Sequence, residues 1–182
     1  MEEASDIVHI RAIASAVRNN EVQTIVRKLL GLLKPGGYLQ WDEQDSSTLE
    51  GRIVSRSTDA KSSMKSLVAV QKSLHAGHGM PRDWLHDLPS TLEQANCKIM
   101  VNDVFNPSPE LSRAWADNLL SVCMGVIDRV PERDIPLPAA SDLPESISRK
   151  SYAKLVQDAA VESRKGSWMG MNQVVIVAKK LS

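Results

Sequence analysis

The stretch LLGLLKPGGYLQWDEQD, residues 29–45, constrains the fold more than any other part of this 182-residue chain. It joins the end of an apolar helical pattern to a Lys-Pro-Gly-Gly sequence, and then to a short apolar run that closes on carboxylates. Apolar side chains recur every three or four positions from Val22 to Leu33, which predicts an amphipathic helix. Asn20 is a suitable N-cap, and the Pro-Gly-Gly sequence is expected to stop the helix.

An apolar, β-branched run from Asp6 to Ile10 precedes this helix and predicts a strand. Strand, helix and strand in close succession form a βαβ unit, whose two strands are expected to be parallel neighbours. Ligands of open α/β sheets bind beyond the carboxyl ends of the strands. The two strands would end near Arg11 and near Glu43, so polar side chains at these positions are expected to lie close together.

Similar patterns predict the rest of the fold. Helices are expected over residues 59–75, 83–95, 109–130 and 148–164, and strands over 97–105 and 172–180. Residues 131–145 contain four prolines and no period, which is typical of a surface loop. We therefore expect a single α/β domain over residues 1–182, with about four strands in a mixed sheet, helices on both faces and a helical insert over about 46–95.

Composition narrows the classes of partner. Lys+Arg and Asp+Glu number 22 each, so the chain lacks the basic excess that nucleic-acid or anionic-membrane partners usually require. We expect neither partner, and the acidic N-terminus does not have the pattern of a secretory signal. Cys97 and Cys123 lack metal-ligand spacing. They are interpreted as reduced core thiols of a cytoplasmic protein, and no metal site is expected.

The order of these elements resembles the C-terminal half of class I S-adenosylmethionine-dependent methyltransferases of the fungal secondary-metabolite type. The segments that carry the resemblance are DIVHIR, LLGLLKPGGYLQWDE, ELSRAWADNLL and RKGSWMGMNQVVIVAKK. It implies a Rossmann-like sheet. In that family the first three strands carry a Gly-rich loop and an acidic residue that hold the cofactor, and this sequence shows neither. The Gly-x-Gly of HAGHG follows a predicted helix and precedes Pro81, which does not fit a strand-to-helix turn.

We therefore expect a truncated methyltransferase-like fold that does not bind S-adenosylmethionine by itself. The strand from Asp6 to Ile10 would then have an open edge, and open edges tend to associate. A homodimer, or a partner methyltransferase-like chain, is expected to cover this edge.

The candidate site lies at the two strand ends. His9, Asp42 and Glu43 are candidate acid/base residues. Burial and the pairing of an imidazole with a carboxylate can bring the pKa of the imidazole or of the carboxylate near neutrality. Adjacent strand residues point to opposite faces, so both carboxylates can share a pocket only if the strand ends there. Each also has a structural interpretation, as a core histidine or a solvated carboxylate. The candidate substrate-binding residues are Arg11, Trp41, His75, His78 and Trp168, whereas Trp84 and Trp115 are expected in the core.

Three functions fit these features. The first is cofactor-independent cyclisation, isomerisation or dehydration of a small apolar natural-product intermediate. The second is a non-catalytic partner subunit of a methyltransferase-like enzyme, and the third is one half of a split methyltransferase.

Overall fold

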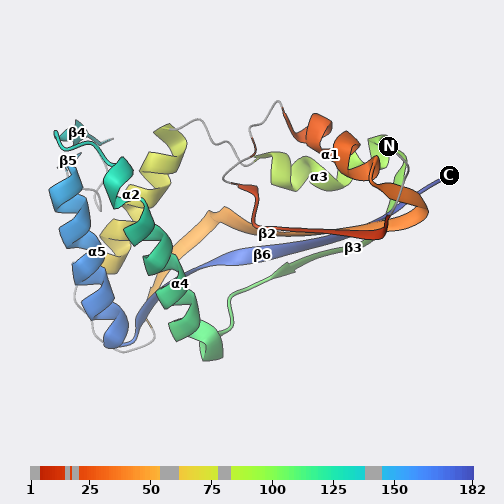
Figure 1. Ribbon diagram of the computed structural model, residues 1–182. Helices are drawn as coiled ribbons and strands as arrows, with labels where there is room; N and C mark the ends of the chain where they lie inside the picture. The colour runs from red at the N-terminus through yellow and green to blue at the C-terminus, as the bar shows by residue number, and fades with distance from the viewer. Residues whose placement is uncertain (1–4, 15–16, 18–20, 54–61, 78–82, 138–144) are drawn as a thin grey trace. The chain divides into compact units, whose positions relative to one another are not determined.

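The computed structural model describes residues 5–14, 17, 21–53, 62–77, 83–137 and 145–182 (Figure 1). The chain divides into two compact units. Unit 1 comprises Met1–Ser47, His78–Asn106 and Asn172–Ser182, and unit 2 comprises Thr48–Gly77 and Pro107–Met171. The assignment of residues 1–182 to a single domain stays a prediction.

A four-stranded sheet runs in the order β1-β2-β6-β3. Its strands are β1 (Ser5–Arg11), β2 (Leu33–Ile53), β6 (Ser167–Lys180) and β3 (Cys97–Phe105). β1 pairs with β2 in parallel, and β3 pairs with β6 antiparallel. The mixed α/β class and the parallel pair predicted from the sequence are confirmed, and β1 lies at an edge of the sheet.

The helices α1 (Val22–Leu30) and α3 (Asp83–Gln94) of unit 1 both cover the same face of its part of the sheet (Figure 1). Alternate strand residues point to this face and form a core with the two helices. Its fully buried members include Val26, Leu39, Trp41, Leu88, Leu92, Ile176 and Ala178. On β6, Val174 and Ile176 are buried, but Val175 and Val177 are only half-buried. β6 is therefore fully buried on one face and only partly covered on the other.

The Pro-Gly-Gly sequence begins a strand instead of ending a helix. α1 ends at Leu30 and is capped by Gly31, so residues 34–37 belong to β2. A Cβ on Gly37 would lie 3.0 Å from the carbonyl oxygen of Asp6, so the glycine lets β1 and β2 approach closely. The predicted cap Asn20 lies outside the described residues.

β2 is much longer than the sequence predicts. It continues through Trp41 and Glu43 to Ile53, so it does not end at the expected position. Residues 46–53 are therefore strand, and the prediction of a helical insert that begins at about residue 46 is wrong there.

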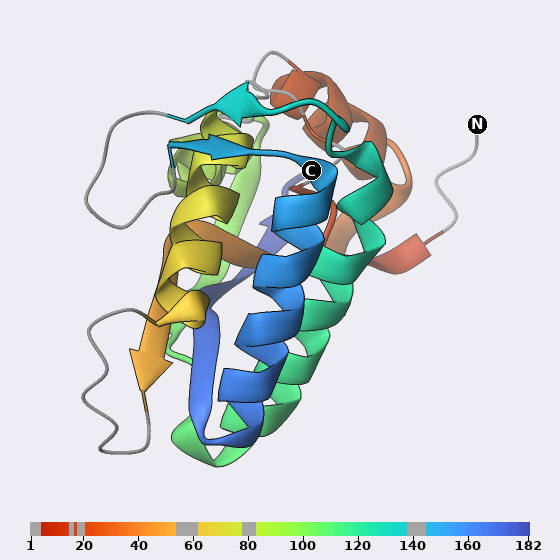
Figure 2. The ribbon, with the colours of Figure 1, turned by 90° about the vertical axis from the view of Figure 1, so that its left-hand side faces the viewer.

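The described residues of unit 2 form three packed α-helices: α2 (Ser63–Gly77), α4 (Ser112–Gly125) and α5 (Arg149–Arg164). α5 lies between the other two (Figure 2). Its capping box at Ser148 and Ser151 confirms the predicted start. The buried core includes Met64, Leu67, Leu120, Tyr152 and Val156. Within the expected loop over residues 131–145 lies β4 (Ile135–Pro136), which pairs with β5 (Ser146–Ile147) just beyond the loop. Residues 138–144 lie outside the described part.

The element expected over residues 109–130 is interrupted at both ends. The 3-10 turns η3 (Pro109–Leu111) and η4 (Ile127–Arg129) flank α4, and their tighter winding breaks the 3.6-residue phase. Leu111 of η3 and Val122 of α4 are both exposed. The face that is buried consists of Ala116, Leu119, Leu120 and Cys123. Both cysteines are free and buried, as predicted.

Candidate functional site

The parallel register of β1 and β2 brings an imidazole and a carboxylate together in unit 1. His9 stands opposite Gln40, and Arg11 stands opposite Asp42. Nε2 of His9 lies 2.9 Å from Oδ2 of Asp42. The imidazole is half exposed, at 49%, whereas the Asp42 side chain is only 12% exposed. The pair therefore combines a shielded charge with an accessible ring.

Gln40 completes this cluster, although the sequence did not single it out. Its side-chain nitrogen donates to both carboxylate oxygens of Asp42, at 3.1 and 3.3 Å. Burial would by itself raise the pKa of Asp42. Hydrogen bonds from Gln40 and His9, together with electrostatic interactions with His9 and Arg11, outweigh burial and lower this pKa below its ordinary value. Asp42 is thus held as a carboxylate.

Glu43 faces away from Asp42, because β2 continues past both residues. Its Oε2 accepts the backbone N–H groups of Ile13 and Ala14, each at 2.9 Å. Its Oε1 accepts the N–H of Gln44 at 3.0 Å. These contacts fasten the turn that follows β1, and the catalytic role assigned to Glu43 stays a prediction. The expectation that the two carboxylates share one pocket required the strand to end there, which it does not.

Trp41 is fully buried in the core of unit 1. Its ring packs against Trp84, with the centroids 5.7 Å apart and the planes tilted by 53°. Trp84 is buried as predicted. Trp41 thus has no exposed ring face in this structure on which a flat substrate could stack.

The remaining candidates lie elsewhere in the chain. His75 belongs to α2 of unit 2, which continues to Gly77, two residues beyond the predicted end of this helix. His78 lies outside the described residues. Trp168, also in unit 2, is buried, with 3% of its surface exposed. It packs so closely that a Cβ on Gly170 would lie 2.7 Å from its ring.

His86 was also missed by the sequence analysis. Its Nε2 lies 3.8 Å from Oδ2 of the buried Asp45, which accepts the N–H and the hydroxyl of Ser47 at 3.0 and 2.5 Å.

Gln40 could have been found from strand periodicity, since it lies two residues before Asp42 on β2. No sequence signal indicates His86, because its place depends on how α3 packs against β2.

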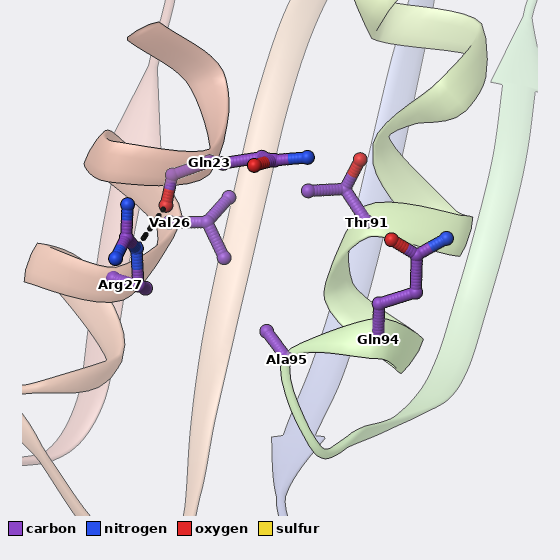
Figure 3. A pocket seen from close by; sticks show the side chains of 6 residues that line it. All are labelled: Gln23, Val26, Arg27, Thr91, Gln94 and Ala95. Atoms are coloured by element: carbon purple, nitrogen blue, oxygen red, sulfur yellow. Dashed lines mark hydrogen bonds between the residues drawn. The ribbon is translucent and has the colours of Figure 1, made fainter.

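A shallow groove of about 210 Å³ lies between α1 and α3 (Figure 3). It is lined by Gln23, Val26, Arg27, Thr91, Gln94 and Ala95. None of the predicted site residues lines it. Within the described ranges, the side chains form no cluster of three or more His, Cys, Asp or Glu that could hold a metal ion. Over the same residues, the helices are too short or too polar to cross a membrane.

Comparison with known proteins gives one partial match in sequence. A segment of 50 residues, 28% of this chain, is 46% identical to the methyltransferase grgD of a Penicillium species and covers 18% of that protein. Over this segment the chain is methyltransferase-like. The resemblance expected from the sequence is confirmed to this extent. No protein-family profile matches the chain.

Solved structures give similarities at low sequence identity. The [4+2]-cyclase SpnF is 16% identical, with a TM-score of 0.44 over 98% of this chain and 50% of its own. A putative methyltransferase from Bacillus halodurans is also 16% identical, with a TM-score of 0.40 over 99% of this chain and 66% of its own. This chain therefore spans half to two thirds of the length of these two proteins.

Proposed function

We propose that His9 and Asp42 form a cofactor-independent acid/base centre in unit 1. The centre acts on a small, mainly apolar natural-product intermediate and promotes cyclisation, isomerisation or dehydration. The observation that carries this proposal is the 2.9 Å contact between a half-exposed imidazole and a shielded carboxylate. A catalytic base must be accessible to its substrate and must be held in a fixed orientation. The exposed ring of His9 meets the first condition, and its contact with the shielded Asp42 meets the second.

In this mechanism Asp42 orients the imidazole of His9 and stabilises the imidazolium that forms when the ring takes a proton from the substrate. In an isomerisation the imidazolium returns that proton to another atom of the same substrate. In a dehydration it protonates the departing hydroxyl, which leaves as water. Arg11 follows on the same side of β1 and supplies a positive charge for a developing oxyanion.

The substrate class rests on the surface around the pair. Ile7, two residues before His9 on β1, stands opposite Tyr38 on β2. By strand alternation both side chains lie on the same face as His9, and Ile7 is 67% exposed. An apolar substrate would cover this surface while its polar atoms meet His9 and Arg11. The natural-product class is carried over from the resemblance to fungal secondary-metabolite methyltransferases that the segments DIVHIR and LLGLLKPGGYLQWDE show.

The turn after β1 supports a mechanism without S-adenosylmethionine. The N–H groups of Ile13 and Ala14 already donate to Glu43, so they do not offer free donors to a cofactor. We therefore assign no step to a cofactor. In this proposal Glu43 acts by holding the turn, and any contribution of His75, His78 or Trp168 to substrate binding is secondary to the pair.

The test is an assay of the purified chain with a metabolite extract of the source organism, without added S-adenosylmethionine, followed by mass spectrometry. We expect His9→Ala and Asp42→Asn to lower the rate by about 100-fold or more, the usual scale of general acid/base catalysis. Glu43→Gln, which preserves one acceptor oxygen, is expected to act mainly through stability. Full rate in all three variants would remove this site from consideration.

The position of β1 favours a second function, that of a partner subunit. β1 lies at the sheet edge, and its Ile7 is largely exposed. A second copy, or a methyltransferase-like chain, would pair along the edge from Asp6 to Ile10. Light scattering after size exclusion checks this, and a monomer of 20.0 kDa at micromolar concentration would contradict self-association. Micromolar binding of S-adenosylmethionine, measured by calorimetry, would instead favour one half of a split methyltransferase.

A further inference from the structure

We infer that Gln40 is a positioning residue of this centre: it fixes Asp42 so that His9 carries its proton on Nε2 and presents Nδ1 as the basic atom. The catalytic meaning of this inference rests on the proposed function. The positioning itself is a property of the folded chain and can be tested without a substrate.

The geometry begins with strand periodicity. Gln40 and Asp42 are two residues apart on β2, so their side chains lie on the same side of the sheet. The amide nitrogen of Gln40 lies 3.1 Å from Oδ1 and 3.3 Å from Oδ2 of Asp42. The carboxylate is thus held by a donor from its own strand as well as by His9 from β1, and both contacts restrict its rotation.

A fixed carboxylate decides the tautomer of the imidazole. An ionised carboxylate can only accept hydrogen bonds, so the ring nitrogen that faces it must carry the hydrogen. At 2.9 Å that nitrogen is Nε2 of His9. In the neutral ring Nδ1 then holds the lone pair, and among the described residues it meets no hydrogen-bond partner. Because the ring is half exposed, Nδ1 is accessible to a substrate.

The other polar side chains near Asp42, those of Arg11 and Gln44, do not hold its carboxylate by a hydrogen bond. Arg11 stands opposite Asp42 in the ladder and contributes charge, but the described contacts include no hydrogen bond between the two side chains. Gln44 lies two residues beyond Asp42 and is half-buried like Gln40, yet its side chain makes no hydrogen bond within the described part of the chain. It therefore offers a matched control.

The experiment measures imidazole tautomers by nitrogen NMR in the full-length chain, with the His9 signals assigned by their loss in His9→Gln. Gln40→Met removes the donors at nearly constant shape, and Gln44→Met makes the same change at the control position. We expect the Nε2–H form to dominate in the wild type and in Gln44→Met. In Gln40→Met the ratio of the two tautomers should fall about fivefold, the scale of one ordinary hydrogen bond.

Gln40→Glu provides a second variant of similar size, in which a carboxylate replaces the donors, and it should disturb the tautomer ratio at least as much. An unchanged ratio in folded Gln40→Met and Gln40→Glu would overturn the positioning role, whatever the activity. A shifted ratio together with full turnover in His9→Ala would leave the positioning role intact and overturn the proposed function instead.

Discussion

His9 of β1 and Asp42 of β2 meet at 2.9 Å, although 33 positions separate them in the sequence. The contact exists because the two strands pair in parallel and place His9 diagonally from Asp42 on one face of the sheet. A shift of the register by one residue would turn one of the two side chains to the opposite face. The contact between His9 and Asp42 therefore depends on the β1–β2 register. Protonation of Asp42 should weaken this contact, because it removes the negative charge of the carboxylate.

The first prediction concerns pH. The pKa of Asp42 is lower in the folded chain than its ordinary value, so its ionised form stabilises the fold. This contribution is fully present above the pKa of the unfolded chain and is lost as the pH falls through the lower folded pKa. The difference in free energy of unfolding between the wild type and Asp42→Asn should therefore shrink from about pH 6 to about pH 3. Urea unfolding at several pH values measures it, and a difference that grows toward low pH would contradict the assignment.

The second prediction concerns Glu43. Its buried carboxylate accepts the N–H groups of Ile13 and Ala14, and Glu43→Ala would leave both without this acceptor. We expect a loss of about 1–3 kcal/mol in the free energy of unfolding, the usual cost of an unsatisfied buried group. Glu93→Ala, at an exposed position of α3, is the control and should change stability by no more than about 0.5 kcal/mol. Equal effects of the two substitutions would show that the turn does not depend on Glu43.

The third prediction compares the effects on stability of replacing two glycines, Gly170 and Gly125, by alanine. A Cβ on Gly170 would lie 2.7 Å from the ring of Trp168 and 2.9 Å from Cγ of Pro107, so Gly170→Ala should cost about 1–3 kcal/mol through overpacking. A Cβ on Gly125, the last residue of α4, would meet no atom within 4 Å outside its chain neighbours and the backbone of its own helix. Gly125→Ala should be neutral or stabilise by up to about 1 kcal/mol, because alanine is the better helix former. Thermal unfolding of both variants measures the contrast, and a stable Gly170→Ala would disprove the close packing of Trp168.

The fourth prediction concerns Cys123 of unit 2. Burial raises the pKa of its thiol to about 11, although hydrogen bonds from Tyr152 and Gln71 partly oppose this shift. Because the thiolate is the reactive form, alkylation by iodoacetamide near pH 8 should be slow in the folded chain and accelerate on unfolding. Mass spectrometry of the peptide that contains Cys123 follows the reaction. Rapid labelling of the folded protein would show that this thiol is accessible.

Local signals in the sequence determined several elements of the fold. The strand Cys97–Phe105 has the predicted bounds, because its apolar residues lie between a helix end and a proline-containing loop. Helix α5 begins after Ser148, as the cap predicts, since capping involves only the first helical turn. The parallel pairing of β1 and β2 also followed, because a short helical crossover leaves few other arrangements.

Only the tertiary structure decided the site. The length of β2 depends on its place beside β6, a strand from the other end of the chain, so the local sequence gave no sign that it continues past Glu43. That continuation places Asp42 with His9 and Gln40, and Glu43 with the turn after β1. The sequence determined which residue types stand near the strand ends. Strand register and length, which arise from contacts between distant segments, determined which of them meet.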